Sequence, residues 1–481
     1  MPVAILVKVT LVNPQIVVVP WNALPTTIDA TCIRLGLAYI SACLKMAGHD
    51  VQLVDLRLLD GWKEYDSALK KQDPDFLAVT MHTCEFNIAI ECCRRARKSS
   101  PRTRTIVGGI HPTMFPDECL KTGVVDYVVR GEGELSLPRL VSNPDEFPPQ
   151  LWGDPPDLDT LPFPDRELWD DYTWRIRFPP FMIKKNPFAP PTVEMLTGRG
   201  CPWQCRFCCG PGEQNLYSRQ SGGTRVPYIR RRSVSNVLDE LDVLYAKHGF
   251  RSIIFHDDQF VIDQRWTEEF CRQMHQRGFV DREVRWWAAS RADIIARYPG
   301  LFREMKSAGL KMVSVGFESF SERILRWLNK GVSVQQNWQA VRILRELDLE
   351  IYGNFIFGVP YADSKYYPED DLKTAEAIAQ IKPEIVSCSF LTPIPGSFLH
   401  DFCEREGLIS CSPDGLGSRF PWESKIAGVD YRFLRQILLR ATGARPSFTE
   451  LASRVARRMG VSNVIRKPYR KFLYRYGVRR P

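Results

Sequence analysis

The 481-residue chain contains no run of about 18 apolar residues, so its sequence predicts no membrane-spanning helix. The first residues, MPVAILVKVTLVNP, lack a basic segment and a small-residue cleavage site, and we expect a β-strand there instead of a signal peptide. No GxGxxG pattern follows that strand, which argues against a dinucleotide-binding domain. The 44% of hydrophobic and 25% of charged residues are typical of globular domains with packed cores.

Closely spaced cysteines are scarce outside one short loop, although the chain has 14 cysteines. Several stand singly on apolar segments (Cys43, Cys271 and Cys388), where reduced cysteine packs as a small hydrophobic residue. The adjacent Cys92 and Cys93 cannot easily bridge each other. We therefore expect a reducing, cytoplasmic compartment and no disulfide framework.

Acidic residues are absent from residues 451–481, which hold ten Lys or Arg. The rest of the chain has 55 basic and 56 acidic residues, so the net charge of +9 comes from this basic tail. Such a tail with interspersed aromatic residues can contact an anionic membrane surface or nucleic acid, or can be a solvated terminal helix. We expect no nucleic-acid partner and leave open a peripheral membrane contact.

Short β-rich runs alternate with helical stretches in residues 1–141. The expected strands are 4–12, 51–55, 76–81, 103–109 and 126–129. Between the first two, Leu37, Ile40 and Leu44 share one helical face, and Gly48 is placed to end that helix. Near-continuous apolar strands separated by helices predict a doubly wound, Rossmann-like parallel sheet that binds ligands at the carboxyl ends of its strands.

Residues 142–191 hold 12 of the 35 prolines and predict a linker that runs over the surface of its neighbours. From residue 192 to 396 the alternation resumes. The expected strands are 192–196, 252–256, 285–289, 311–316, 351–358 and 385–391. Six strands with helical crossovers, including a helix over 234–247, predict a partial (βα)6 barrel. Residues 397–481 predict a smaller, mostly helical C-terminal region.

The loop GRGCPWQCRFCCG, residues 198–210, follows the first barrel strand and contains four cysteines. The spacing fits no common zinc pattern, because no second pair of ligands follows and Cys209 directly adjoins Cys208. Three thiolates on one loop can hold three corners of a cubane iron–sulfur cluster and leave the fourth iron open to a small molecule. Glycines in the loop let the backbone wrap the cluster, and Phe207 can shield it.

The spacing Cys201-x3-Cys205-x2-Cys208, with Phe207 beside the last cysteine, resembles the signature of radical S-adenosylmethionine (SAM) enzymes. The resemblance implies that these three cysteines bind a 4Fe–4S cluster and that Cys209 is not a ligand. In that family the open iron chelates SAM, one electron breaks a sulfur–carbon bond, and the 5′-deoxyadenosyl radical abstracts hydrogen from the substrate.

The same resemblance implies further SAM contacts at the strand ends. These are Phe207, Asp257 and Asp258 in HDDQF, Arg291, Glu318 in GFES, and Gly358 in IFGVP. The common GGE form is absent at HDDQF, so the two aspartates are alternatives. Arg291 could instead form an ordinary ion pair, and Gly358 could simply terminate its strand. Trp286 and Trp287 are either cavity-lining residues or core aromatics.

The segments RLGLAYISACLKMAGHDVQLVD, VGGIHPTMFPDE and DYVVRGEGE resemble the cobalamin-binding domain that precedes the radical SAM domain in one large subfamily. The resemblance implies cobalamin contacts at Thr80, Thr83, Gly108, Gly109, His111, Gly131, Glu132 and Gly133. The DxHxxG motif, whose histidine ligates cobalt, is absent, so we expect cobalamin without a histidine ligand. The remaining alternative is a flavodoxin-like domain that only docks partners.

The resemblance implies a cobalamin-dependent radical SAM enzyme, most simply a methyltransferase that acts on an unactivated carbon. A radical cyclase or an oxidative rearrangement, as in tetrapyrrole ring formation, is the alternative reaction. A sensor that uses the cluster and cobalamin for detection is a second alternative. The expected partners are a small-molecule or lipid-like substrate and a reducing protein of the flavodoxin or ferredoxin type.

Overall fold

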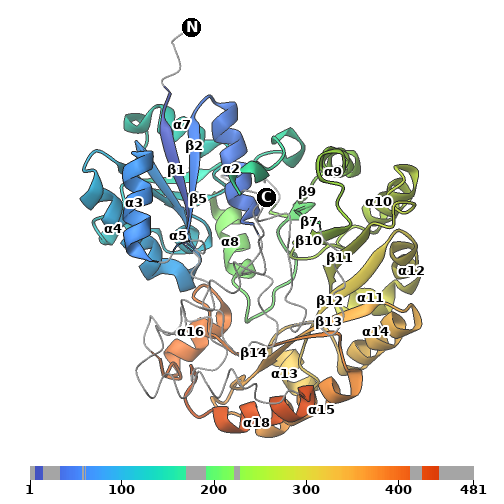
Figure 1. Ribbon diagram of the computed structural model, residues 1–481. Coiled ribbons are helices and arrows are strands. Elements are labelled where there is room, and N and C mark those ends of the chain that lie inside the picture. Colours follow the sequence, from blue (N-terminus) through green and yellow to red (C-terminus); the bar gives the residue numbers. More distant parts are fainter. Residues whose placement is uncertain are drawn as a thin grey trace.

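The computed structural model describes residues 6–14, 33–56, 59, 61–169, 191–220, 228–411 and 425–443. These residues form two parallel sheets that lie side by side, with helix α8 (Gly210–Gln220) between them (Figure 1). The basic tail, residues 451–481, lies outside the described residues. None of the described helices combines the length and the apolar character that crossing a membrane requires.

The N-terminal domain contains a six-stranded parallel sheet with the strand order β2-β1-β3-β4-β5-β6. Its strands are β1 (Lys8–Asn13), β2 (Asp50–Asp55), β3 (Phe76–Thr80), β4 (Arg104–Gly108), β5 (Tyr127–Gly131) and β6 (Gln150–Gly153). Its helices are α2 (Leu35–Met46), α3 (Trp62–Gln72), α4 (Phe86–Ser99), α5 (Ile110–Met114), α6 (Pro116–Lys121) and α7 (Ser136–Ser142). Helices α2 and α7 cover one face and α3, α4 and α6 the other, which confirms the doubly wound sheet and all five strands expected in it.

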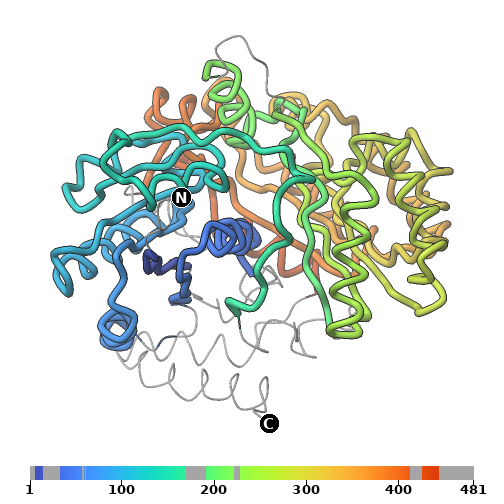
Figure 2. The backbone as a smooth tube through the Cα atoms, turned by 90° about the horizontal axis from the view of Figure 1, so that it is seen from above, coloured from blue at the N-terminus to red at the C-terminus, as the bar shows by residue number. Residues whose placement is uncertain are grey.

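Strand β6 lies inside the segment that the prolines predicted as a linker. It pairs with β5 at the edge of the sheet, where a proline-flanked strand is tolerated because one side needs no partner. The following residues pack instead of looping outward: Trp169 is buried and its indole donates a 3.2 Å hydrogen bond to Asp55. Figure 2 shows this segment passing between the two domains.

The second sheet is also parallel and six-stranded, with the order β14-β13-β12-β11-β10-β7, and it confirms the six strands expected in the barrel. Its strands are β7 (Thr192–Met195), β10 (Ser252–Phe255), β11 (Arg285–Ser290), β12 (Leu310–Glu318), β13 (Glu350–Phe357) and β14 (Ile385–Phe390). Its helices are α8, α9 (Val234–His248), α10 (Gln264–Gln276), α11 (Ala292–Arg297), α12 (Pro299–Ser307), α13 (Glu322–Trp327), α14 (Val334–Glu346) and α15 (Pro368–Ile381). β7 and β14 are the two ends of the sheet, so these strands form an open partial barrel.

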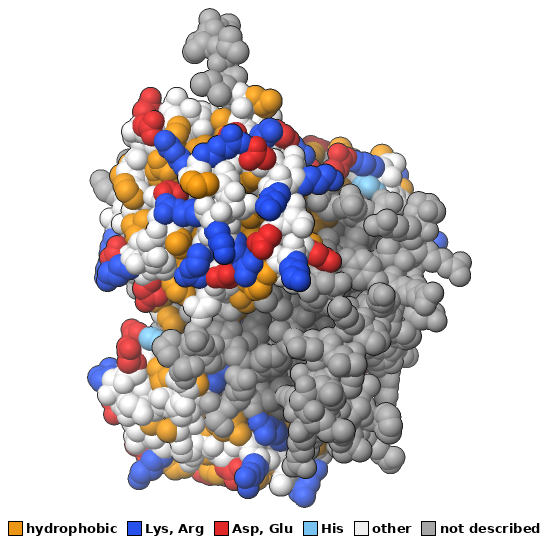
Figure 3. All heavy atoms as spheres, turned by 60° about the vertical axis from the view of Figure 1, so that its left-hand side comes forward, with side chains coloured by type: hydrophobic (Ala, Val, Ile, Leu, Met, Phe, Trp, Pro, Cys, Tyr) orange, Lys and Arg blue, Asp and Glu red, His pale blue; other side chains and the backbone are white. Residues whose placement is uncertain are grey.

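Helices α16 (Phe398–Arg405) and α18 (Tyr431–Thr442) belong to the C-terminal region, and α18 packs against α15. On the face of the N-terminal domain seen in Figure 3, basic and acidic side chains are interspersed. The ion pairs of this domain include Arg95 with Asp66 and Arg102 with Asp73. That face therefore presents mixed charge.

Candidate active site

The cysteine loop leaves the barrel at the carboxyl end of β7, passes through the short strand β8 (Gly198–Arg199) and ends at α8. Gly200 has a φ of +85°, and a Cβ atom there would lie 2.5 Å from the carbonyl oxygen of Tyr228. Only glycine allows the loop to pass this close to its neighbour.

The three predicted cluster ligands all lie on this loop. Cys205 is buried, Cys201 is half-buried and Cys208 is exposed. The Cys208 N–H donates to the Cys205 carbonyl (3.1 Å), and the Gly210 N–H donates to the Cys208 sulfur (3.3 Å). In the described part of the chain no three His, Cys, Asp or Glu side chains are close enough to share one metal ion. A cubane cluster does not need that, because each thiolate binds a different iron. The donor set and the wrapped backbone therefore fit a 4Fe–4S cluster.

Cys209 faces the same region but differs in its bonding. A hydrogen bond with Cys209 raises the pKa of Cys208. That Cys209 is not a cluster ligand stays a prediction.

Lys330 is a buried cation beside the cluster loop that the sequence analysis missed. Its ammonium donates a 2.9 Å hydrogen bond to Glu318 and lies 5.8 Å from the centre of the Phe207 ring. Burial raises the pKa of Cys205, and the charges of Lys330 and Arg291 oppose that rise. These two cations therefore favour the thiolate that a cluster needs.

Glu318 lies at the carboxyl end of β12, as predicted, in an unusual backbone conformation. Its φ is +60°, and the pairing of β12 with β13 shifts register beside it. A Cβ atom on Gly316 would lie 2.5 Å from the Glu318 carboxylate. Because Gly316 has no side chain, the Glu318 carboxylate has room to lie beside it. The positive φ of Glu318 is a strained conformation, and such conformations cluster at functional sites.

Arg291 follows β11 and joins that strand end to the cysteine loop. Its guanidinium stacks on the ring of Trp203 (4.6 Å), donates to the Lys330 carbonyl (2.6 Å) and pairs with Asp293 (2.8 Å). The predicted contact to the SAM carboxylate stays a prediction. The observed contact with the cysteine loop is the one through Trp203.

The two aspartates of HDDQF have different surroundings. The Asp257 carboxylate is buried and accepts hydrogen bonds from the backbone (3.1 Å) and hydroxyl (2.6 Å) of Thr197, so it joins the ends of β7 and β10. Asp258 forms no hydrogen bond or ion pair with a described residue. Burial raises the pKa of Cys201, and the nearby charge of Asp258 adds to this rise. Asp258 is therefore the better placed of the two to contact a ligand at the cluster.

Gly358 has a φ of +71° at the end of β13, and its N–H donates to Asp371 on α15 (2.9 Å). A Cβ atom there would lie 3.2 Å from Leu434 on α18. These contacts hold the turn from the helical side of the barrel. Its predicted contact to SAM stays a prediction.

The sequence left open whether Trp286 and Trp287 line the barrel interior or pack in the core. Trp286 is fully buried against the outer helices, whereas Trp287 points to the opposite face of β11. Trp287 lies 6.0 Å from Tyr352 in a stacked arrangement and 6.0 Å from His256 edge-on. The His256 ring lies 4.0 Å from the Glu194 carboxylate. The interior thus presents both flat aromatic surfaces and polar groups.

The predicted cobalamin contacts gather at the carboxyl edge of the first sheet. Gly109, which follows Gly108 and β4, has a φ of +99°, and a Cβ atom there would lie 2.9 Å from Thr80 Oγ1 and from the Met81 carbonyl. The backbone therefore folds tightly at this edge.

His111 turns its ring into the N-terminal domain. The ring lies between Phe86 and Phe115, and its Nδ1 is 3.2 Å from the hydroxyl of Thr83. Burial lowers the pKa of His111 to about 4. The ring is thus a neutral core group, and any cobalamin contact at this position would come from its backbone.

The loop after β5 contacts the second domain, and its predicted cobalamin contacts stay a prediction. Glu132 stands between Gly131 and Gly133. Its carboxylate forms ion pairs with Arg199 and Arg230 of the second domain. The side chain itself faces the second domain.

The two ligand-binding edges face each other. Helix α5 of the first domain packs on α8, and Met114 Cε lies within 2.9 Å of a Cβ position on Gly212 and 2.5 Å of one on Gly396. The absence of side chains at these two glycines lets the domains approach. A cofactor on the first sheet would therefore face the mouth of the barrel.

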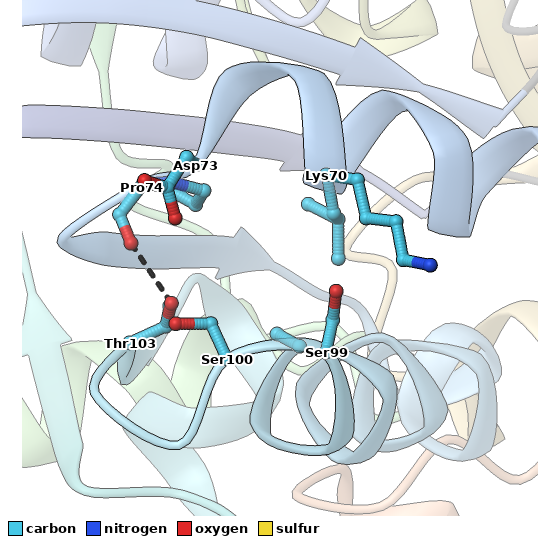
Figure 4. A pocket seen from close by; sticks show the side chains of 8 residues that line it. Lys70, Asp73, Pro74, Ser99, Ser100 and Thr103 are labelled. Carbon is cyan, nitrogen blue, oxygen red and sulfur yellow. Dashed lines mark hydrogen bonds between the residues drawn. The ribbon is translucent and has the colours of Figure 1, made fainter.

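A small pocket between α3 and α4 lies at the other end of the sheet. Figure 4 shows Thr103, whose hydroxyl donates to the Pro74 carbonyl (2.8 Å), with Asp73 and Ser100 beside it. These residues precede β3 and β4, so the pocket opens at the amino edge, away from the cysteine loop.

Comparison with known proteins identifies both domains. Residues 22–141 match the B12 binding domain, and residues 195–397 match the radical SAM superfamily. An uncharacterised methyltransferase of Pyrococcus horikoshii is 27% identical over an alignment that covers 81% of this chain and 82% of that protein. The anaerobic magnesium-protoporphyrin IX monomethyl ester cyclase of Cereibacter sphaeroides is 28% identical over 75% of this chain, which spans only 58% of the cyclase.

Solved structures share the fold. The methyltransferase TsrM from Kitasatospora setae, with cobalamin and a 4Fe–4S cluster bound, aligns with a TM-score of 0.60 and 17% identity over 90% of each chain. The cobalamin-dependent enzyme OxsB aligns with a TM-score of 0.66 and 15% identity, over 90% of this chain and 66% of OxsB. The chain therefore belongs to the cobalamin-dependent radical SAM enzymes, with a 4Fe–4S cluster, SAM and cobalamin as its cofactors.

Proposed function

We propose that this enzyme transfers a methyl group from cobalamin to a substrate carbon that is not nucleophilic. The observation that carries the proposal is the packing of Met114 against Gly212 and Gly396, which seats the cobalamin edge of the first sheet on the helix that follows the cysteine loop. Two reacting groups held face to face gain the proximity that such a transfer needs.

The residues of the barrel have separate tasks in this proposal. Cys201, Cys205 and Cys208 hold the cluster, while Lys330 and Glu318 offer one charge of each sign to the zwitterionic end of SAM. When bound, the cluster would supply the electron that cleaves SAM, and cobalamin would carry the methyl group. The interior residues Trp287 and Tyr352 would exclude water from the substrate radical.

Relatives that are named as methyl-transferring enzymes support methyl transfer. The hopanoid C-3 methylase of Methylococcus capsulatus is 26% identical over 76% of this chain and 67% of that protein. The cyclase relative is equally similar, so a radical cyclisation is the second candidate reaction. We further propose a small-molecule substrate in the barrel and a flavodoxin- or ferredoxin-type reductant.

The test uses anaerobic full-length protein with its cluster reconstituted and cobalamin loaded. SAM with a labelled methyl group is added with reductant, and label on cobalamin, S-adenosylhomocysteine and 5′-deoxyadenosine are measured. We expect label on cobalamin together with S-adenosylhomocysteine. Formation of 5′-deoxyadenosine without any label on cobalamin would contradict methyl transfer and favour the cyclase reaction. Failure to cleave SAM at all would favour a sensor.

A further inference from the structure

The carboxylate of Glu132 connects the two domains. It forms ion pairs with Arg199 and Arg230, and the hydroxyl of Tyr217 donates a 3.2 Å hydrogen bond to it. All three partners belong to the radical SAM domain, whereas Glu132 follows β5 of the cobalamin-binding domain. A second acid, Glu134, accepts a 2.6 Å hydrogen bond from Arg199.

This group of two acids and two arginines is largely removed from solvent. The exposed fractions of the side chains are 10% for Glu132, 5% for Glu134, 20% for Arg199 and 12% for Arg230. Strand β8 pairs antiparallel with β9 (Arg230–Arg231), which sets Arg199 opposite Arg230 and directs both guanidinium groups to one carboxylate. The charges balance, so each one depends on the others for compensation.

The partners of Glu132 flank the cysteine loop. Arg199 stands two residues before Cys201, and Tyr217 lies on α8, which begins at Gly210 directly after the loop. Glu132 therefore holds the segments on both sides of the cluster ligands.

On its other side, Glu132 is joined to the remaining cobalamin-binding loops. The N–H of Gly131 donates to the hydroxyl of Thr113 (2.9 Å), and that hydroxyl donates to the Gly109 carbonyl (2.8 Å). A continuous series of hydrogen bonds and ion pairs thus runs from the end of β4 to the cysteine loop.

We propose that Glu132 is a positioning residue that fixes the distance between cobalamin and the iron–sulfur cluster by binding both sides of the cysteine loop. A radical step that needs both cofactors is sensitive to their separation, since small displacements of reacting groups cost much of the rate. The inference rests on the sites assigned to the two cofactors in the proposed function. It does not depend on which reaction follows.

The test compares three variants of the loaded full-length enzyme. Glu132→Gln keeps the shape and removes the charge, and Arg230→Gln changes the network from the side of the barrel. Glu269→Gln, on the partly exposed surface of α10 where it pairs with Arg272, is the matched control. Pulsed EPR measures the spin–spin interaction between the reduced cluster and Co(II) cobalamin. We expect a broadened distance distribution in the first two variants and an unchanged one in the control.

Unchanged distance distributions in both network variants would overturn the proposal. It would also be overturned if Glu132→Gln lost cobalamin affinity while Arg230→Gln kept it, because Glu132 would then be a direct contact. If Glu132→Gln does not fold, the distance distribution between the cluster and cobalt in Arg230→Gln decides whether the proposal holds. A protein that never methylates a substrate contradicts the proposed function alone and leaves this measurement valid.

Discussion

Lys330 and Glu318 form a 2.9 Å ion pair whose side chains are only 8% and 10% exposed. The pair lies beside Cys205, and its glutamate is held in place by the missing side chain of Gly316. A buried pair of this kind costs desolvation energy that its own attraction scarcely offsets. In the proposed function the two charges complement the ammonium and the carboxylate of SAM, which would offset this cost.

The first prediction concerns this pair. Lys330→Met should lower the free energy of unfolding by about 3–5 kcal/mol, because it leaves the Glu318 charge buried and unpaired. The double variant Lys330→Met/Glu318→Gln should recover most of that loss while still binding SAM poorly. Urea unfolding and SAM titration measure the two effects. Additive losses in the double variant would contradict the pairing.

The second prediction separates the adjacent cysteines. Cys208→Ala should lose most of the iron and the absorbance of the cluster after reconstitution, because two thiolates remain for a cluster that needs three. Cys209→Ala should keep both the iron and the cluster absorbance. It is the matched control, because the same Cys→Ala change removes the neighbouring thiol. Equal iron loss in both variants would show that Cys209 is also a ligand.

The third prediction tests the tight backbone at the cobalamin edge. Gly109→Ala should destabilise the protein by about 1–3 kcal/mol, because the residue has a φ of +99° and its Cβ atom would meet Thr80 and Met81 at 2.9 Å. Gly300→Ala, where a Cβ atom has open space on α12, should be neutral or stabilising by up to about 1 kcal/mol. Thermal unfolding of both variants measures the difference, and equal melting temperatures would refute the crowding.

The fourth prediction concerns pH. Burial raises the pKa of Asp371 from 3.8 to about 7, so between these values the folded state binds more protons than the unfolded chain. The free energy of unfolding should therefore fall as the pH rises from about 4 to about 7, by up to roughly 1 kcal/mol per pH unit, and level off above. Asp371→Asn should remove this slope. Denaturant unfolding at pH 5 and pH 7 compares the two proteins, and an identical slope in both would exclude Asp371 as its source.

The sequence predicted the strands because each is an apolar run bounded by turn residues, and all eleven expected strands are present in the two sheets. It did not predict β6, since QLWG is a four-residue edge strand between prolines. The cysteine loop carried its chemistry in local spacing. No local pattern in the sequence indicates Lys330 or the partners of Glu132. Glu132 and Arg230, for example, are 98 residues apart, and only the folded structure brings them together.

The two adjacent tryptophans show a second limit. Trp286 and Trp287 stand in a strand whose faces are both largely buried, so apolar character does not tell which face each one occupies. Only the packing of Trp286 against the outer helices assigns Trp287 to the interior.

The stretch after β6 also bears on how the two domains could be separated. Arg166, deeply buried, binds Glu240 of α9 and the Glu194 carbonyl, so residues that continue the first domain in sequence are anchored inside the second. A fragment cut at residue 141 would expose the flank of β5 that β6 covers, and one cut at residue 169 would leave Arg166 without its acid. The pair of domains should melt in a single transition. If either domain were exchanged for that of a relative, Arg166 and Glu240 would have to come from the same protein.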